Sequence, residues 1–134
     1  MTRFPRTLFS AVLMILVLCG LMAGNANAAW STDPTINDAI STAAGDQTYP
    51  KTISDGSGGA IIVWSDNRNG NGDLYAQRVD ANGAVHAGWA AGGVPISIAI
   101  GEQTNPKITS DGSGGAIITW TDTRDFATLG YDVY

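Results

Sequence analysis

Cysteine and histidine are nearly absent from this sequence, which leaves few residues for disulfides, metal sites or acid–base catalysis. The 134 residues include one cysteine and one histidine. Cys19 lies within an apolar N-terminal run, so the rest of the chain has no cysteine and must be stabilised by packing or bound ions. A lone histidine, His86, is a weak basis for a catalytic triad or a metal site.

Positive charge is also scarce. Seven Lys and Arg residues stand against twelve Asp and Glu residues, for a net charge of −5. Two of the basic residues precede the apolar run, so the chain from residue 29 onward carries a net charge of about −7. Nucleic acid binds through its phosphates to basic surfaces and is therefore not an expected partner. Glycine, in contrast, is abundant with 17 residues, which is typical of short strands joined by tight turns.

The N-terminus has the pattern of a secretory signal peptide. Arg3 and Arg6 form a positive region, and the apolar run Leu8–Gly24 follows. Ala26-Asn27-Ala28 then supplies the small residues that signal peptidase requires, which predicts cleavage before Ala29. We therefore expect residues 1–28 to be removed and the mature protein to be secreted or held at the cell surface, without a membrane segment.

Two alternatives for this N-terminal segment are less well supported. A retained membrane anchor would need a longer apolar run with a basic stop-transfer flank, whereas Gly20 and Gly24 interrupt this one. A lipoprotein signal would need a small residue directly before the lipidated cysteine, and Leu18 precedes Cys19. Cys19 is therefore expected to be an ordinary apolar residue of the signal peptide.

An internal repeat with a period of 56 residues organises the rest of the chain. Gly45–Arg68 aligns with Gly101–Arg124 without a gap, and 17 of the 24 positions are identical. After a divergent stretch with a three-residue insertion, Asp73–Tyr75 matches Asp132–Tyr134. The predicted organisation is a signal peptide (1–28), the last strand of a preceding repeat (29–44), a complete unit 1 (45–100) and a truncated unit 2 (101–134).

The second copy ends inside the repeat. In unit 1 the residues "AQRVDANG" follow Tyr75, whereas unit 2 ends at Tyr134. We therefore expect the chain to be part of a longer protein in which similar residues follow. A stop codon directly after Tyr134 in the intact gene would contradict this expectation.

Each unit is expected to form four strands. In unit 1 the two apolar faces of Ala60–Ser65 predict a strand that is covered on both sides. Asn82-Gly83 predicts a two-residue hairpin turn. The sequence therefore predicts an all-β fold of antiparallel four-stranded units, similar to the blades of a β-propeller, with a β-sandwich as the alternative. The four expected strands are Pro50–Ser54, Ala60–Ser65, Asp73–Asp80 and Ala84–Ser97.

The repeated residues resemble a known type of repeat. The pattern SDGxGGAIIxWxDxR…DxYAQRVD resembles a tandem repeat of large secreted and cell-surface bacterial proteins. The repeats of that family are interpreted as propeller-like blades, so the resemblance implies a propeller in an extracellular multi-repeat protein. It implies no activity, because the family has no established catalytic residues that could be transferred to this chain.

The glycine-rich stretch Ser54–Gly59 recurs in unit 2 and raises the question of a phosphate site. A phosphate cradle needs a helix N-terminus, usually with a lysine and a hydroxyl following. An apolar strand with neither residue follows here. The stretch is therefore predicted to be a tight turn whose aspartate, Asp55, bonds to local N–H groups.

The stretch after the first repeated tryptophan has the alternating oxygen side chains of a calcium loop. Asp and Asn residues with intervening glycines can surround a hard cation with oxygen ligands. Unit 2 loses this alternation, so a solvated hairpin is the alternative interpretation. The candidate calcium ligands are Asp66, Asn69, Asn71 and Asp73.

Two tryptophans and two arginines are the candidates for ligand binding. Trp30 and Trp89 lie in loosely patterned segments and could stack on a sugar, although core packing is the alternative. Arg68 and Arg124 each follow an Asp-x-Arg pattern beside a tryptophan. They could contact a ligand or lock a turn through a hydrogen bond to that aspartate.

These observations favour a non-catalytic exported module that binds a glycan or protein at the cell surface, or serves as a surface scaffold. Its structural partners would be the remaining blades of the full-length chain. The alternative is a fragment of a propeller-type glycoside hydrolase or lyase whose catalytic residues lie outside this chain. No cofactor is expected apart from the candidate calcium ion.

Overall fold

The computed structural model describes residues 30–134, so the predicted signal peptide and Cys19 lie outside the described residues. The strands of the described residues all lie in antiparallel sheets and there is almost no helix, which confirms the all-β prediction. None of its helices has the length and apolarity needed to cross a membrane. The elements are β1 (Gln47–Ser54), β2 (Ala60–Asp66), β3 (Asp73–Val79), β4 (Val94–Ser97), β5 (Gln103–Ser110), β6 (Ala116–Asp122), α1 (Phe126–Leu129) and β7 (Asp132–Val133).

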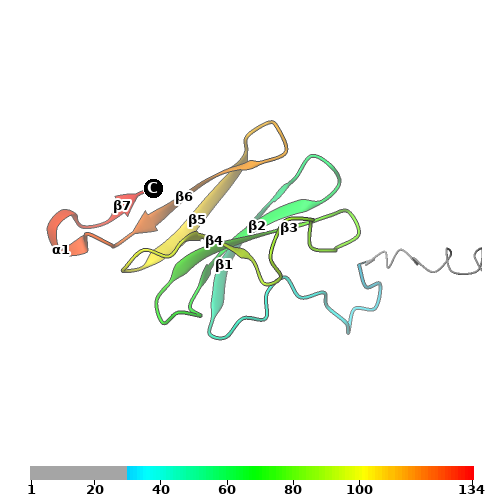
Figure 1. Cartoon of the computed structure of the whole chain (residues 1–134), viewed down its shortest axis with the longest axis horizontal. Helices are drawn as coiled ribbons and strands as arrows, with labels where there is room; N and C mark the ends of the chain where they lie inside the picture. Colours follow the sequence, from blue (N-terminus) through cyan, green and yellow to red (C-terminus); the bar gives the residue numbers. More distant parts are fainter. Residues whose placement is uncertain (1–29) are drawn as a thin grey trace, which may run out of the picture.

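The strands form two sheets, one for each repeat unit. Unit 1 contains a four-stranded sheet in the order β1-β2-β3-β4, and unit 2 contains a three-stranded sheet in the order β5-β6-β7. Strand β5 lies against β1, β2 and β3 (Figure 1). The turns that connect β1 to β2 and β5 to β6 lie at the same end of the molecule, where a Cβ on Gly114 would be 3.4 Å from the backbone oxygen of Asp55.

Strand β2 is the centre of the core, as its two apolar faces predict. Ile61 and Val63 point to the side of unit 2 and are 3% and 0% exposed. Trp64 points to the opposite face and is 3% exposed, because the loop before β4 crosses it. A Cβ on Gly93 in that loop would lie 2.5 Å from the indole ring.

The first strand of each unit begins earlier than expected and contains a bulge. β1 begins at Gln47 rather than at Pro50, and its pairing with β2 shifts between Thr48 and Lys51. The residue before the proline takes a positive φ in both units, 54° at Tyr49 and 52° at Asn105. A bulge of this kind, with one residue in the left-handed region, bends the strand before it meets its partner.

The expected fourth strand, Ala84–Ser97, is mostly loop. Only Val94–Ser97 forms β4, and Val85 contributes a single bridge to Val79. Gly92 and Gly93 take φ values of 80° and 97°, which interrupt an extended strand. The prediction of one long irregular strand is therefore wrong over its first ten residues.

The turn at Asp80–Gly83 also differs from the prediction. A two-residue turn of the expected type needs a positive φ at both central residues, but only Gly83 has one, at 84°. The backbone N–H of Asp80 instead donates to the oxygen of Ala84 at 2.9 Å, which closes a three-residue loop. The carboxylate of Asp80 accepts from the N–H groups of Asn82 and Ala84, so it holds the wider loop in place.

Two further segments lie beside the sheets. Residues 29–44 are predicted to form the last strand of a preceding repeat, but residues 30–46 contain no strand. The hydroxyl of Ser41 donates to the backbone oxygen of Gly92 at 3.5 Å. In unit 2 the three-residue insertion forms the short helix α1 where unit 1 has a turn. Neither segment interrupts the pairing of the main strands.

Candidate functional site

The glycine-rich turn of unit 1 is closed by its own aspartate. Oδ1 of Asp55 accepts the N–H groups of Ser57 and Gly59, both at 2.8 Å. Oδ2 accepts Nε and Nη2 of Arg78 at 3.0 and 2.9 Å. The hydrogen bond from Ser57, together with Arg78, lowers the pKa of the Asp55 carboxyl. These N–H groups are occupied by a carboxylate of the same chain, as expected for a structural turn and not for an anion cradle.

Unit 2 repeats the turn but lacks the arginine. Oδ1 of Asp111 accepts the N–H groups of Ser113 and Gly115 at 2.7 and 2.9 Å. Its Oδ2 has no hydrogen-bond or ion-pair partner within the described part of the chain, and the residue is exposed. The two turns therefore share their internal hydrogen bonds but differ in what binds the outer carboxylate oxygen and in the burial of the aspartate.

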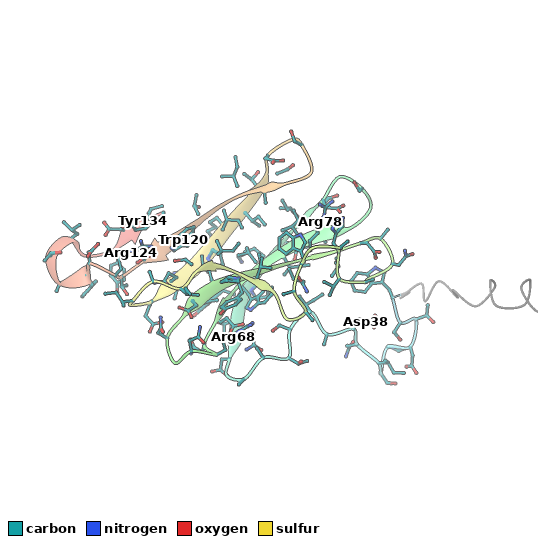
Figure 2. The ribbon with its side chains drawn as sticks, viewed as in Figure 1. Asp38, Arg68, Arg78, Trp120, Arg124 and Tyr134 are labelled. Atoms are coloured by element: carbon teal, nitrogen blue, oxygen red, sulfur yellow. The ribbon has the colours of Figure 1, made fainter. Side chains whose placement is uncertain are left out.

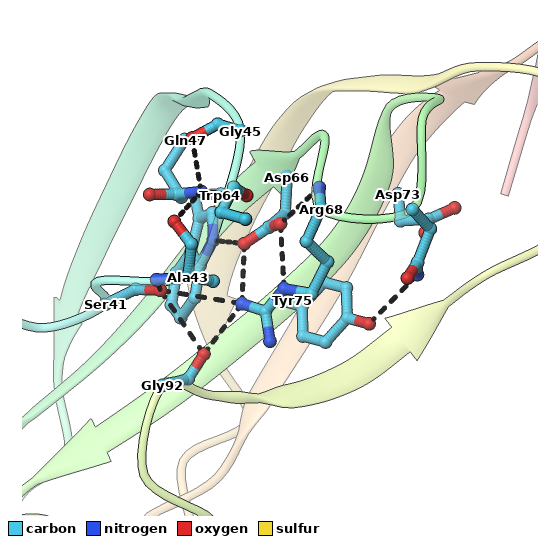
Figure 3. Close-up of polar contacts among 12 residues, drawn as sticks. Ser41, Ala43, Gly45, Gln47, Trp64, Asp66, Arg68, Asp73, Tyr75 and Gly92 are labelled. Carbon is cyan, nitrogen blue, oxygen red and sulfur yellow. Dashed lines mark hydrogen bonds and ion pairs between the residues drawn. The ribbon is translucent and has the colours of Figure 1, made fainter.

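A second feature that recurs in both units is a group of four side chains, here called the Trp–Asp–Arg–Tyr cluster. In unit 1, Nε1 of Trp64 donates to Oδ2 of Asp66 at 2.7 Å. Nε and Nη2 of Arg68 donate to the two oxygens of the same carboxylate at 2.8 and 2.6 Å (Figure 3). The guanidinium carbon lies 3.8 Å above the ring of Tyr75, which in turn stacks on Trp64.

Unit 2 contains the same cluster from Trp120, Asp122, Arg124 and Tyr134 (Figure 2). Nε1 of Trp120 lies 3.0 Å from Oδ2 of Asp122, and the guanidinium of Arg124 lies 3.9 Å above Tyr134. The sequence indicated the tryptophan, aspartate and arginine, but it did not indicate the tyrosine. The signal was present, because the two copies match again at the Asp-x-Tyr that ends in Tyr75 and Tyr134.

The cluster also determines what Arg68 and Arg124 can contact. Arg68 makes a further bond from Nη2 to the backbone oxygen of Gly92 at 2.8 Å, and Ser41 lies 3.5 Å from the same nitrogen. Arg124 binds Asp122 through the same two atoms. Both guanidinium groups are thus held by their own unit, with side-chain exposures of 21% and 28%.

The cluster predicts a specific pH dependence. The hydrogen bond from Arg124 lowers the pKa of Asp122 to about 2, below the ordinary value of 3.8. Because the folded-state pKa is lowered, the carboxylate stabilises the fold above about pH 4 and this stabilisation is lost as the pH falls toward 2. We therefore expect Asp122→Asn to lower the free energy of unfolding at pH 7 but to have almost no effect near pH 2.

Urea unfolding of both proteins at several pH values measures this difference directly. The comparison with wild type removes the contributions of the other carboxylates, because they are common to both proteins. A difference between the two proteins that stays constant from pH 7 to pH 2 would contradict the assigned ion pair.

Three of the four candidate calcium ligands lie together, and the fourth, Asp66, is directed away from them. Asp66 turns toward Trp64 and Arg68, whereas Asn69 and Asn71 donate their amide N–H groups to the two oxygens of Asp73 at 2.7 and 3.1 Å. The amide of Asn71 also donates to the backbone oxygen of Gly101 at 2.7 Å. Within residues 30–134 no three His, Cys, Asp or Glu side chains are grouped to hold a metal. In this structure the segment from Asp66 to Asp73 is linked to the start of unit 2 by the hydrogen bond from Asn71 to Gly101.

The two candidate sugar-stacking residues lie apart from these clusters. Trp30 is 46% exposed, and its ring lies over the loop at Gly83, where an added Cβ would be 2.9 Å from it. Trp89 is half-buried, and its N–H donates to the oxygen of His86 in a turn. Trp30 therefore presents more of its ring to solvent than Trp89 does.

An apolar groove lies on the face of unit 1 that is turned away from unit 2. It encloses a cavity of about 220 Å³. It opens beside the Trp–Asp–Arg–Tyr cluster, because Trp64 belongs to both. Its lining residues are Ile40, Ser41, Gln47, Pro50, Ile62 and Trp64.

Comparison with known proteins adds no relative: no family model, curated protein or solved structure matched the chain.

Proposed function

We propose that the chain is a non-catalytic, exported module of stacked β-propeller-type blades, used for extracellular binding or as a surface scaffold. The carrying observation is that an antiparallel sheet, a turn and a Trp–Asp–Arg–Tyr cluster recur in both units, and that the two sheets pack against each other. The polar side chains that recur in both units bond mainly to their own unit. This is the expected arrangement for a scaffold that repeats, and the N-terminal pattern supports export.

The burial of equivalent residues shows how the units stack. In unit 2 both Gln103 and Pro106 are fully buried, because β5 lies against the sheet of unit 1. In unit 1 the equivalent glutamine, Gln47, is half-buried, and the equivalent proline, Pro50, is exposed. Repeat proteins bury such faces against a neighbouring unit, so the groove of unit 1 is the place where another blade of the longer protein would pack.

The far face of unit 2 is the matching open surface. Ile117 is 56% exposed, whereas its equivalent Ile61 is 3% exposed beneath unit 2. A cavity of about 110 Å³ lies beside it. This open face consists of Lys107, Thr109, Ile117 and Thr119, and a following blade would cover it.

Adding a blade tests this proposal. The chain is extended after Tyr134 with the sequence of residues 76–100, which completes unit 2, and then with a further copy of residues 45–100. We expect the free energy of unfolding to rise by about 2 kcal/mol or more, because burying a face that contains an isoleucine contributes about this amount. The urea dependence of unfolding should also steepen as more surface becomes buried.

Ile117→Asp provides the matched control. Ile117 is exposed in the present chain, so the substitution should be almost neutral there and clearly destabilising in the extended chain. Equal effects in both proteins, or an extension that adds no stability, would contradict the stacking model. Hydrolysis of a glycan by the present chain would contradict the non-catalytic assignment.

A further inference from the structure

The segment between β4 and β5 exposes two isoleucines where the preceding copy of the repeat has smaller residues. Ile98 is 61% exposed and Ile100 is 79% exposed. With the period of 56 residues, they correspond to Thr42 and Ala44. The change to isoleucine at both positions enlarges the apolar surface of the protein without filling its core, and apolar surface that gathers in one place marks a contact site.

The exposure of these isoleucines does not depend on the strands that unit 2 lacks. Unit 1 has all four strands and is followed by unit 2, and there the equivalent residues Thr42 and Ala44 are still exposed. Ile96 differs, because its equivalent, Ile40, lines the groove of unit 1, so the completed sheet of unit 2 is expected to cover it. The two isoleucines after β4 therefore belong to a surface that remains open in a longer protein.

The short helix α1 adds two further apolar side chains. Phe126 and Leu129 are its first and last residues, and both are more than half exposed. Unit 1 has Asn69 and Gly70 at the tip of the corresponding loop, and both are exposed although unit 2 follows. A following unit would therefore leave the tip of the α1 loop open as well.

The isoleucine segment and α1 meet at Thr123. The backbone N–H of Glu102 donates to Oγ1 of Thr123 at 2.7 Å, and a Cβ on Gly101 would lie 2.9 Å from the backbone carbonyl carbon of Thr123. The N–H of Phe126 donates to the oxygen of Thr123 at 3.1 Å. Because Ile100 directly precedes Gly101, the two segments form one surface at the end of the molecule where Figure 1 labels α1. This Ile–Phe surface consists of Ile98, Ile100, Phe126 and Leu129.

The charged groups beside the Ile–Phe surface are carboxylates. Glu102 follows Ile100 by two residues, Asp125 directly precedes Phe126, and both acidic residues are exposed. The neighbouring Arg124 is already held by the carboxylate of its own cluster. An acidic rim repels a second copy of this acidic chain and the anionic headgroups of a membrane, whereas it attracts Lys and Arg side chains.

We propose that the Ile–Phe surface binds a segment of another polypeptide that carries both apolar side chains and Lys or Arg residues. The apolar side chains of the partner cover the isoleucines and α1, which supplies most of the affinity. Its basic side chains pair with Glu102 and Asp125, which supplies orientation and speeds association. The inference rests on the proposed function and deepens its binding role, because it names the surface and the chemistry of the partner.

A synthetic peptide of alternating Lys and Leu residues is the probe, because it combines both features. In ¹⁵N-labelled protein we expect this peptide, at millimolar concentration or below, to shift the amide signals of the four residues of the Ile–Phe surface. A peptide of alternating Glu and Leu should not shift them. Asp125→Asn should weaken binding about threefold at low salt and less at high salt, because a charge pair at the rim is exposed and screened.

The double variant with Ile98→Thr and Ile100→Ala is the matched test, because it introduces the residues that unit 1 has at these positions. Both isoleucines are exposed, so the free energy of unfolding should stay unchanged, whereas binding of the Lys–Leu peptide should weaken about tenfold or more. Val85→Thr alters an exposed apolar residue elsewhere in unit 1 and should leave binding as it is in the wild type.

The proposal is wrong if the Lys–Leu peptide shifts none of the four signals, if the Glu–Leu peptide binds as tightly, or if the double variant binds as tightly as the wild type. It is also wrong if the protein dimerises through this surface, or if phosphatidylcholine vesicles occupy it and the peptide does not displace them. The blade-extension experiment concerns the faces of the sheets and not this surface, so either proposal can fail while the other holds.

Discussion

Gly59→Ala is expected to destabilise the protein by about 3 kcal/mol or more, an effect at the upper end for a single added methyl group. A Cβ at this position would overlap the backbone oxygen of Val79 and lie 3.0 Å from Cα of Asp80. The first atom belongs to Val79, the last residue of β3, which pairs with Ala60, and the second belongs to the residue that follows it, so neither can move without disturbing the end of the β2–β3 pairing. Urea unfolding followed by tryptophan fluorescence measures the loss, because Trp64 lies on β2.

Gly115→Ala is the internal control for this prediction. It introduces the same methyl group into the same turn sequence, but the nearest atoms are the end of the flexible Asp111 side chain. We expect a loss of about 1 kcal/mol or less, since a surface change that displaces only a side chain has a small effect. Equal effects of the two substitutions would show that the turn itself, and not the third strand, determines the requirement for glycine at this position.

The sequence predicted those elements whose pattern is local. The alternation of Ala60–Ser65 and the breaks at both of its ends are enough to place β2, and the structure gives Ala60–Asp66. The bulge at Tyr49 could not be predicted, because tyrosine rarely takes a positive φ and only the pairing with β2 imposes it. The strand predicted over Ala84–Ser97, with an irregular glycine-containing middle, is shorter in the structure, because the positive φ values of Gly88, Gly92 and Gly93 confine β4 to Val94–Ser97.

The candidate site shows the same division. The Asp-x-Arg pair beside a tryptophan could be identified in the sequence because it recurs, and the structure places all three side chains in contact. The tyrosine beneath the guanidinium comes from the next strand, seven residues after Arg68 in unit 1 and ten after Arg124 in unit 2. Such a contact depends on how two strands pair, which the local pattern does not contain. The link from Asn71 to Gly101 was missed for the same reason.

Asp66→Ala is expected to lower the free energy of unfolding by about 3–5 kcal/mol, the range found when one partner of a buried ion pair is removed. Asp66 is fully buried and accepts from Trp64 and from Arg68, both its side chain and its backbone N–H. Burial raises the pKa of its carboxyl, but the hydrogen bonds from Arg68 and Trp64 outweigh this effect and lower the pKa below its ordinary value. Alanine would leave the indole N–H of Trp64 without its acceptor and the guanidinium of Arg68 without its carboxylate partner.

Asp122→Ala in unit 2 is the matched control. It removes the equivalent aspartate from a less buried cluster, so the difference between the two losses of unfolding free energy reports the contribution of burial. Trp120 is only half-buried, and among residues 30–134 Arg124 has no bond equivalent to the one that Arg68 makes with Gly92, so in this structure water can solvate both groups once the carboxylate is gone. We expect a loss of about 1.5–3 kcal/mol there, the contribution of a single hydrogen bond to a charged group. Urea unfolding of both variants at pH 7 measures the two values. Equal losses would mean that solvent reaches the cluster of unit 1 as readily as that of unit 2. The cluster of unit 1 would then not stabilise its sheet as a buried group.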